Sequence, residues 1–512
     1  MKVIREATTQ DLKKHLYKNF DNNDFKLYDE VNSLDYIGIF QFTGQAAKGL
    51  VKYLQPENFQ ELNAINAFAR PGTMDNAYLF KEGKEGVKSK YPEVVREVVE
   101  NTNGVILYQE QAMKIFEVAG GFSLEEANEV RSLMKKLGKL EKDPEDLKKW
   151  EKTLNKFKKN AVKKGMTEQD VDKLGEDLIK FSFYSFNLSH STSYTYLAAM
   201  TLYLSIYFRK YFYSSVLEYE IDRDKETLSV MNTIKRKGID IHPPNVNHSS
   251  IRVSPGEGKE IYFGLSNIKH VSEKVAEGIV LNRPYESIID FIIKTRKDKE
   301  YSRVINKRVI ENLIKIGAFD ELIGAERKKM LTVFTKFWEE KKSIKVEEKL
   351  IALWNKTVKS VEALGGFTTT NIDRINFEKE LFGFNFFSSL FTNKSKQVIE
   401  KIYSKGLCEK GIFAVEDKSI KIPVVIDSMR IITDKNDNEM AFVEIEDMFN
   451  EKISVPIFAS YWKNIKDIIE NGQDKIFLMN LFRDDKGGIL FGQKGFVKSE
   501  QVMRRMIKEL PT

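Results

Sequence analysis

Two pairs of closely spaced aspartates have the residue type and spacing for metal-dependent phosphoryl chemistry. Asp170 and Asp172 form one D-x-D pair, and Asp222 and Asp224 form the other. Two-metal catalysis needs carboxylates that hold ions about 4 Å apart. The first pair opens a predicted helix just after Met166, where acids favour the helix dipole, and the second lies in a charged turn. Both are interpreted as solvated caps, so the residues by themselves define no catalytic centre.

The histidines and the single cysteine do not form a local metal motif. Five histidines are spread widely along the chain, and Cys408 alone excludes a disulfide scaffold or a thiolate cluster. His242 and His248 flank Pro243 and Pro244, and a zinc pair there is the less favoured alternative to ordinary loop residues. The sequence also lacks the G-x-x-x-x-G-K-[ST] phosphate loop.

Polar strings inside apolar stretches are a stronger signal. They are ARPG at 69–72, GVILYQEQ at 104–111, RSLMKK at 131–136 and FNLSHS at 186–191. One such string is usually packing or capping, and Ser189 and Ser191 could simply cap an apolar helix that begins near Tyr194. That helix N-terminus, with His190 beside it, is also a reasonable place for a phosphate. Four strings are harder to explain by packing alone.

A lysine-rich segment predicts an amphipathic helix. From Leu147 to Lys164 there are eight lysines and one acid, Glu151, while the apolar residues Trp150, Leu154, Phe157 and Ala161 recur at helical spacing. Its outer face is either a solvated helix surface or a rail for a phosphate backbone, because clustered lysines release counterions on binding nucleic acid. The candidate DNA contacts are Lys148, Lys152, Lys156, Lys159 and Lys163.

The elements that position these residues indicate a mixed, mostly α multidomain protein with a small C-terminal β-barrel. The chain of 512 residues is long enough for about three or four domains. Long helical patterns with glycine-containing turns run to about residue 225, and short strands interrupt them at 236–265. The expected boundaries are an N-terminal helix at 1–30, a helical domain at 31–225, a region of loops, short strands and helices at 226–320, a helical linker at 321–410, the barrel at 411–498 and a tail at 499–512.

The last hundred residues are β-branched and aromatic runs separated by turns. Three strands, the helix ASYWKNIKDIIENG and two further strands are the element order of an OB barrel. In the second strand, alternation places Ala441, Val443 and Ile445 on one face and Phe442, Glu444 and Glu446 on the other. An outward Phe442 could stack a base, although the flanking acids favour a surface without nucleic acid.

Together these strings resemble the C family of bacterial replicative DNA polymerases, the DNA polymerase III alpha subunits. The similarity runs in order along most of the chain. It is carried by GIFQFTGQAAKGLVKYLQPENFQEL, ARPG, GVILYQEQAM, GFSLEEANEVRSLMKK, YSFNLSHSTSYTYL, IHPPNVNHSS, IYFGLSNIK, NKRVIENLIKIGAFDEL and FEKELFGF. The resemblance implies a fingers domain, a helix-hairpin-helix region and an OB domain.

The resemblance also implies a site for an incoming deoxynucleoside triphosphate in the fingers. Arg131 and His190 match the family residues that face its phosphates and sugar, and Tyr184 and Phe186 would lie near the nascent base pair. A guanidinium gives bidentate phosphate contacts, and an aromatic ring stacks a base. The remaining candidates for nucleotide binding are Arg70, Lys135, Lys136, Asn187 and Ser189, and Lys269 is a further candidate for DNA binding.

Three departures from the family pattern stand out. A second family arginine is Ser132 here, and the family's glycine before the lysines is Lys135. The glycines of the first hairpin are His270 and Ser272, so we expect a tight DNA-gripping hairpin to be weakened there. No glutamine-led clamp-binding peptide is evident between residues 320 and 400.

The family's PHP domain and most of its palm, with the catalytic aspartates, have no counterpart in the sequence. We therefore expect a split DNA polymerase, in which a separate palm- and PHP-bearing chain holds Mg²⁺ and this chain is inactive alone. The expected partners are primer-template DNA, dNTP and that chain, with a sliding clamp as a further candidate. Low glycine and high lysine usage is compatible with an AT-rich bacterium or a phage, and a phage is the favoured source.

Two other functions stay open from the residues. One is a non-catalytic DNA-binding or replisome-interacting protein, a regulator or decoy derived from such a polymerase, and the other is a helical scaffold. The net charge of +7 favours polyanions without naming one. No uncharged stretch of about 18 apolar residues occurs, and the N-terminus lacks the apolar core of a signal peptide. These features predict a soluble, cytoplasmic protein without a membrane partner.

Overall fold

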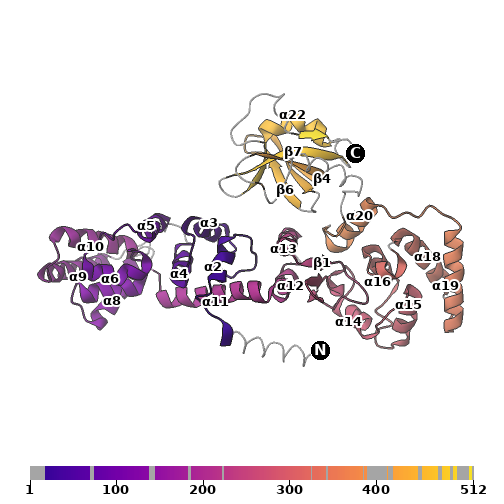
Figure 1. Cartoon of the computed structure of the whole chain (residues 1–512), viewed down its shortest axis with the longest axis horizontal. Helices are drawn as coiled ribbons and strands as arrows, with labels where there is room; N and C mark the ends of the chain where they lie inside the picture. Colours follow the sequence, from indigo (N-terminus) through magenta and orange to yellow (C-terminus); the bar gives the residue numbers. More distant parts are fainter. Residues whose placement is uncertain are drawn as a thin grey trace. The chain divides into compact units, whose positions relative to one another are not determined.

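The computed structural model divides the chain into two compact units, Met1–Tyr213 and Ser214–Thr512 (Figure 1). The described residues are 18–69, 74–137, 144–182, 186–221, 224–324, 326–341, 344–384, 386–388, 412, 415, 419–447, 452–470, 475–484, 488–492 and 507–509. Helices dominate both units, and a small antiparallel sheet occupies the C-terminal region. This confirms the predicted mixed, mostly α fold. None of the described helices is long and apolar enough to cross a membrane.

The first unit is helical throughout its described part. Its elements are α2 (Phe25–Asn32), α3 (Gln45–Leu54), α4 (Phe59–Phe68), α5 (Met74–Lys84), α6 (Glu93–Val99), η1 (Glu100–Thr102), α7 (Gln109–Val118), α8 (Leu124–Leu137), α9 (Pro144–Lys163), α10 (Glu168–Ser182) and α11 (Leu188–Tyr207). A further helix, α12 (Arg209–Glu220), follows after a break at Phe208. The apolar segment 188–220 thus forms two helices, and Leu197 and Tyr211 are exposed on their surfaces.

Two hydrophobic cores hold this unit together. In one, α11 packs against α2 and α4, and its Ala198, Ala199 and Leu202 are fully buried. Figure 1 shows α11 as the long magenta helix beside these two. In the other, α6 to α10 enclose Phe116 and Phe157. Each such buried side chain contributes about 1.5–3 kcal/mol to folding.

The helical part of the second unit surrounds one large core that includes Phe291, Phe319 and Phe334. Its helices are α13 (Asp224–Arg236), α14 (Glu273–Leu281), α15 (Ile288–Lys297), α16 (Lys307–Ile316), α17 (Asp320–Ile323), α18 (Arg327–Glu340), α19 (Glu347–Glu362) and α20 (Asn371–Phe382). A small sheet of β1 (Asp240–His242), β3 (Glu260–Tyr262) and β2 (Ser254–Pro255) and the short helix η2 (Leu265–Asn267) precede α14. The prediction of a loop with short strands at 236–265 is confirmed.

The C-terminal sheet has the strand order β6-β5-β4-β7-β8, and β9 also pairs with β7. Its elements are β4 (Ile420–Thr433), β5 (Glu439–Asp447), β6 (Lys452–Ile457), α22 (Ala459–Glu470), β7 (Ile476–Arg483), β8 (Ile489–Phe491) and β9 (Ile507–Glu509). The long strand β4 pairs with both β5 and β7, and the outer strands β6 and β8 approach each other, so the sheet nearly closes into a barrel. The predicted order of strands and helix is confirmed, whereas the OB assignment stays a prediction.

The faces of β5 are only partly as predicted. Ala441, Val443 and Ile445 are buried as expected and belong to the barrel core, and Glu446, which was predicted on the opposite face, is buried as well. Glu446 is fully buried because it pairs across the strands with Lys452 of β6, at 3.1 Å between Nζ and Oε2. Phe442 carries the Arg430 guanidinium 5.4 Å from its ring centre, so a cation already covers the ring proposed to stack a base.

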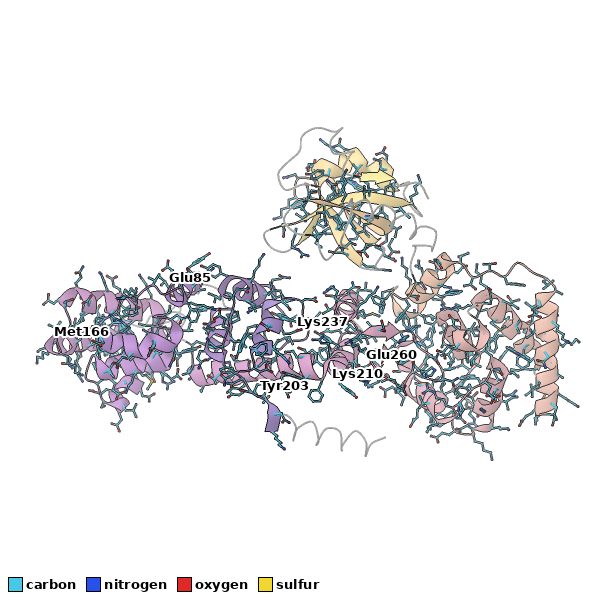
Figure 2. All side chains as sticks on the ribbon, in the orientation of Figure 1. Glu85, Met166, Tyr203, Lys210, Lys237 and Glu260 are labelled. Carbon is cyan, nitrogen blue, oxygen red and sulfur yellow. The ribbon has the colours of Figure 1, made fainter. Side chains whose placement is uncertain are left out.

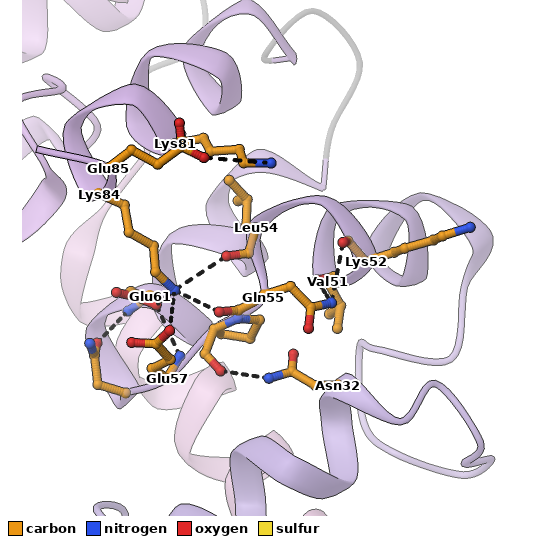
Figure 3. A network of polar contacts seen from close by, with 12 residues as sticks. Asn32, Val51, Lys52, Leu54, Gln55, Glu57, Glu61, Lys81, Lys84 and Glu85 are labelled. Carbon is orange, nitrogen blue, oxygen red and sulfur yellow. Dashed lines mark hydrogen bonds and ion pairs between the residues drawn. The ribbon is translucent and has the colours of Figure 1, made fainter. Parts of the chain in front are cut away.

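Lys84 fastens the end of α5 to the loop between α3 and α4 (Figure 3). Its ammonium donates to the Gln55 carbonyl at 2.6 Å and to Glu61 Oε2 at 2.8 Å. The Glu57 amide donates to the same Glu61 oxygen at 2.9 Å. Gln55 adopts the left-handed φ of 46° that ends α3, and Lys84 satisfies the carbonyl group exposed there. The network therefore holds the C-terminal end of α5 against the loop between α3 and α4.

We predict that Lys84→Met lowers the free energy of unfolding by about 2 kcal/mol, because a half-buried carboxylate and a carbonyl would lose their donor. Lys81→Met, on the same helix, is the matched control. Lys81 faces Glu85 at 3.8 Å in an exposed pair, so its loss should cost less than about 1 kcal/mol. Urea denaturation of both variants measures the difference, and equal losses would contradict the assigned role of Lys84.

Candidate nucleotide and nucleic-acid sites

The first candidate site lies at the start of α11. Asn187 caps this helix by accepting the His190 amide proton at 2.8 Å, and the Ser189 hydroxyl donates to the same Asn187 oxygen at 2.6 Å. The helix therefore begins at Leu188, earlier than the sequence suggested, and Asn187 rather than a serine is its cap. Ser191 is fully buried and donates to the Asn63 carbonyl of α4 at 3.2 Å.

Glu110 of α7 joins this helix start to the 104–111 string. Its carboxylate accepts the Asn187 side-chain amide and the Leu188 backbone amide, each at 2.8 Å. The Gln109 amide also donates to the Phe186 carbonyl at 2.8 Å. Sequence reasoning quoted Glu110 within its string but assigned it no role, since only the tertiary contact reveals one. The amides of Leu188 and His190 are thus occupied, and a phosphate here would be held by side chains.

An aromatic row fixes the imidazole of His190. The ring lies edge-on to Phe186, with centroids 5.6 Å apart, and 4.3 Å from the ring of Tyr194. Tyr194 in turn contacts Phe40 at 5.3 Å. His190 itself is exposed, whereas Phe186 is only 7% exposed. Phe186 therefore supports the histidine from behind, and its ring offers little surface for a base.

Arg131 and Lys136 lie on α8, whose buried residues Val130 and Met134 belong to the core of α6 to α10 rather than to that of α11. The Arg131 Nε donates to Asn128 Oδ1 at 3.0 Å, which leaves its terminal nitrogens for other acceptors. Lys136 pairs with Asp146 at 3.3 Å. The backbone of Lys135 continues the helix, but its side chain falls outside the described structure, as do Arg70 and Tyr184.

The lysine-rich helix α9 confirms the amphipathic prediction, with Trp150, Phe157 and Ala161 buried. Its lysines divide into two groups. Lys156 pairs with Glu126, which lowers the pKa of that carboxyl, and Lys158 pairs with Asp172 at 2.6 Å. The other group is exposed and has no ion pair among the described residues: Lys148, Lys152, Lys159 and Lys163. Their spacing places them along one stripe opposite the buried face.

The third candidate is the hairpin before α14. His270 adopts a φ of 70°, so the left-handed turn survives without the glycine, and the expectation of a weakened hairpin is not met by the backbone. The Lys269 amide donates to the Leu381 carbonyl at 3.0 Å, and Asn312 donates to the Lys269 carbonyl at 2.8 Å. Burial, Arg308 and Lys269 lower the pKa of His270. Two exposed basic residues of a braced loop therefore lie near the exposed Arg308 of α16.

The aspartates and histidines considered as metal ligands make other contacts in the structure. Thr167 donates to Asp170 at 2.7 Å at the start of α10, as expected of a cap, and Asp172 pairs with Lys158. The His242 and His248 rings both stack on Tyr262, and each imidazole pairs with a separate glutamate. In the described part of the chain, no group of three or more histidine, cysteine or acidic residues could hold a metal ion. Asp222 is outside this part.

Comparison with known proteins identifies two regions. Residues 1–165 match the bacterial DNA polymerase III alpha subunit finger domain, which includes Arg131 and the α9 stripe. Residues 238–330 match a helix-hairpin-helix motif, which includes Lys269 and His270.

Curated relatives extend the similarity along most of the chain. The DNA polymerase III subunit alpha of Aquifex aeolicus is 30% identical over 90% of this chain and 38% of its own length. That of Campylobacter jejuni is 30% identical over 92% of this chain and 39% of its own length. The Bacillus subtilis protein is 27% identical over 88% of this chain. The chain thus spans about two fifths of the length of the curated relatives it matches.

We predict that DNA affinity rises as the pH falls from 8 to 6 if a phosphate binds beside His270. The free imidazole is neutral at pH 7 because its pKa is lowered, and a nearby phosphate would favour the protonated form. The gain should stay below about tenfold, because one pKa unit is worth about 1.4 kcal/mol. His270→Gln should flatten the profile in an anisotropy titration, and an unchanged slope would exclude His270 from the interface.

Proposed function

The chain is a relative of the bacterial DNA polymerase III alpha subunits over about nine tenths of its length, and on this premise we propose that it functions in DNA replication. In this role it supplies the fingers and duplex-binding part of a DNA polymerase. The observation that carries the proposal is the ordered match of both the finger region and the helix-hairpin-helix region. A role in nucleotidyl transfer follows from the family, and this chain would contribute substrate binding to it.

The incoming dNTP would meet the start of α11 and the face of α8. The exposed His190 imidazole is held by Phe186 and Tyr194, so a donor has a fixed orientation before the nucleotide arrives. The terminal nitrogens of Arg131 would give the charge-assisted contacts that triphosphates require. Ser189 adds a hydroxyl, and the cap residue Asn187 positions rather than binds. Lys135 and Lys136 would add positive charge to the α8 side.

Primer-template DNA would be held by two basic surfaces, one in each compact unit. The exposed stripe on α9 can follow a phosphate backbone, because its four ammonium groups occupy one helix face and have no ion pair with the residues that the structure describes. In the second unit, the hairpin carries the exposed Lys269 ammonium and the exposed, titratable His270 on a turn that hydrogen bonds to its backbone fix. Neither surface reads bases, so the expected binding is independent of DNA sequence.

The catalytic step would need carboxylates that hold Mg²⁺, and we propose that a separate palm- and PHP-bearing chain supplies them. The two ions would stabilise the transferring phosphoryl group, while this chain's residues bind and orient the triphosphate. Such an assembly would work in the cytoplasm of a bacterium or of a phage-infected cell. A sliding clamp is a further proposed partner.

We predict that this chain extends no primer alone and that adding the palm-bearing chain restores extension. In that complex, Arg131→Ala and His190→Ala should each raise the KM for dNTP about tenfold or more, since a hydrogen bond to a charged group is worth about 1.5–3 kcal/mol. Lys173→Ala on α10 is the control and should leave the KM for dNTP unchanged. Robust extension by the single chain would refute the split arrangement. If no primer is extended with any palm-bearing chain, the alternative of a non-catalytic regulator or decoy is favoured.

The α9 stripe generates a separate prediction on salt dependence. Replacing Lys148, Lys152, Lys159 and Lys163 by glutamine should reduce the slope of log affinity against log salt for duplex DNA by up to about 3.6, at about 0.9 per phosphate contact. The control is Lys349→Gln/Lys356→Gln, which removes exposed charges from α19. A stripe variant with the slope of the control would show that α9 is only a solvated surface.

A further inference from the structure

A second cavity lies in the first unit, and of the candidate segments described above only the start of the 104–111 string lines it. The cavity measures about 670 Å³, and its walls come from the end of α5, loop 87–91, turn 103–106 and α10. Figure 2 marks its neighbourhood by Glu85, which directly follows α5. This volume lies in the range of pockets that hold small ligands.

The wall beside α10 is braced by one carboxylate. Asp177 accepts a hydrogen bond from the Tyr91 hydroxyl at 2.8 Å and pairs with the Lys90 ammonium at 2.6 Å. Both partners belong to loop 87–91, so Asp177 ties this loop to the helix. The carboxylate is thereby neutralised, and it contributes little repulsion toward an anion in the cavity.

The opposite wall depends on close backbone packing. Asn103 and Gly104 both adopt left-handed φ values, 48° and 85°, so the chain turns sharply at the cavity. Gly83 of α5 lies directly against this turn, because a Cβ there would come within 1.9 Å of the Asn103 carbonyl oxygen. The Asn103 side-chain nitrogen is buried without an acceptor in the described structure. The sharp turn and the close approach of Gly83 together shape this wall of the cavity.

Two lysines give the cavity its unbalanced charge. Lys88 and Lys180 are exposed, line the cavity, and form no ion pair with any described residue. Glu82 is the remaining lining acid once Asp177 is neutralised. The cavity therefore carries two free ammonium groups against one free carboxylate, which favours an anionic ligand.

Apolar side chains occupy the mouth of the same cavity. Leu79 is 45% exposed and Val87 is 59% exposed, and both line it. Large exposed apolar residues beside free lysines suit a ligand with a flat apolar part and an anionic part. We propose that this cavity binds a nucleoside phosphate, with Lys88 and Lys180 on the phosphate and with Leu79 and Val87 against the base.

The nucleotide could come from two sources with the same chemistry. One is an unpaired nucleotide of the template strand, which rests on the proposed function in DNA replication. The other is a free nucleotide, which needs no DNA. Neither source requires the residues of α11, α8 or α9 to take part, so the two sites can be tested separately.

The test uses the full chain with two probes, deoxyadenosine monophosphate in calorimetry and a fluorescent single-stranded oligonucleotide of ten adenines in anisotropy. Lys88→Gln/Lys180→Gln should weaken binding of the oligonucleotide about tenfold, while Lys349→Gln/Lys356→Gln leaves it unchanged. Leu79→Ser should also weaken binding, because it removes an apolar contact to the base. Leu79 is 45% exposed, so we expect the fold to tolerate this replacement. Primer-template duplex without an overhang reports separately on the proposed function.

Each outcome decides one point. Loss of binding of both probes in the double variant supports the site with free nucleotide as a ligand, and loss for the oligonucleotide alone supports the template strand as the source. Equal affinity of the double variant and its control overturns the inference, as does competition by inorganic phosphate as strong as that by the nucleotide. If wild type binds the duplex but neither probe, this inference fails and the proposed function stands. Failure to bind the duplex would instead contradict the proposed function.

Discussion

The carboxylate of Glu110 is the contact on which the candidate nucleotide site depends. It joins α7 to the start of α11 across 77 residues of sequence by accepting one side-chain and one backbone amide. Hydrogen bonds to an ionised group are among the stronger ones in proteins. They set the first turn of α11, and this turn presents His190 against Phe186 and Tyr194. The precision of the site therefore comes from a residue that need not touch a ligand.

The lysines of the first unit fall into two groups, those that pair with carboxylates of the protein and those that do not. Lys84, Lys156 and Lys158 form ion pairs with carboxylates of the first unit and thereby connect its helices. The lysines of the α9 stripe, and Lys88 and Lys180 of the 670 Å³ cavity, have no such partner among the described residues. The net charge of +7 describes only the sum. The surfaces suited to anions are therefore those whose lysines have no carboxylate partner among the described residues.

The hairpin before α14 illustrates how tertiary contacts override a local preference. A histidine in the left-handed region is disfavoured relative to glycine, yet His270 holds a φ of 70°. Hydrogen bonds from Lys269 to Leu381 and from Asn312 to Lys269 brace the loop on both sides. The substitution keeps the turn and adds a titratable group to it. In a similar compensation, the buried carboxylate of Glu446 pairs with Lys452 of the neighbouring strand.

The sequence by itself determined the mostly helical class, the amphipathic α9, the order of the C-terminal strands and the family resemblance, because periodicity and motif strings are local properties. It did not locate the cap at Asn187 or the break at Phe208, and it could not determine the burial of Glu446, since this depends on Lys452 across a strand. Only the tertiary structure decided which lysines remain free and that Glu110 holds the start of α11. Pairing and burial are properties of the folded contacts, and no spacing along the chain encodes them directly.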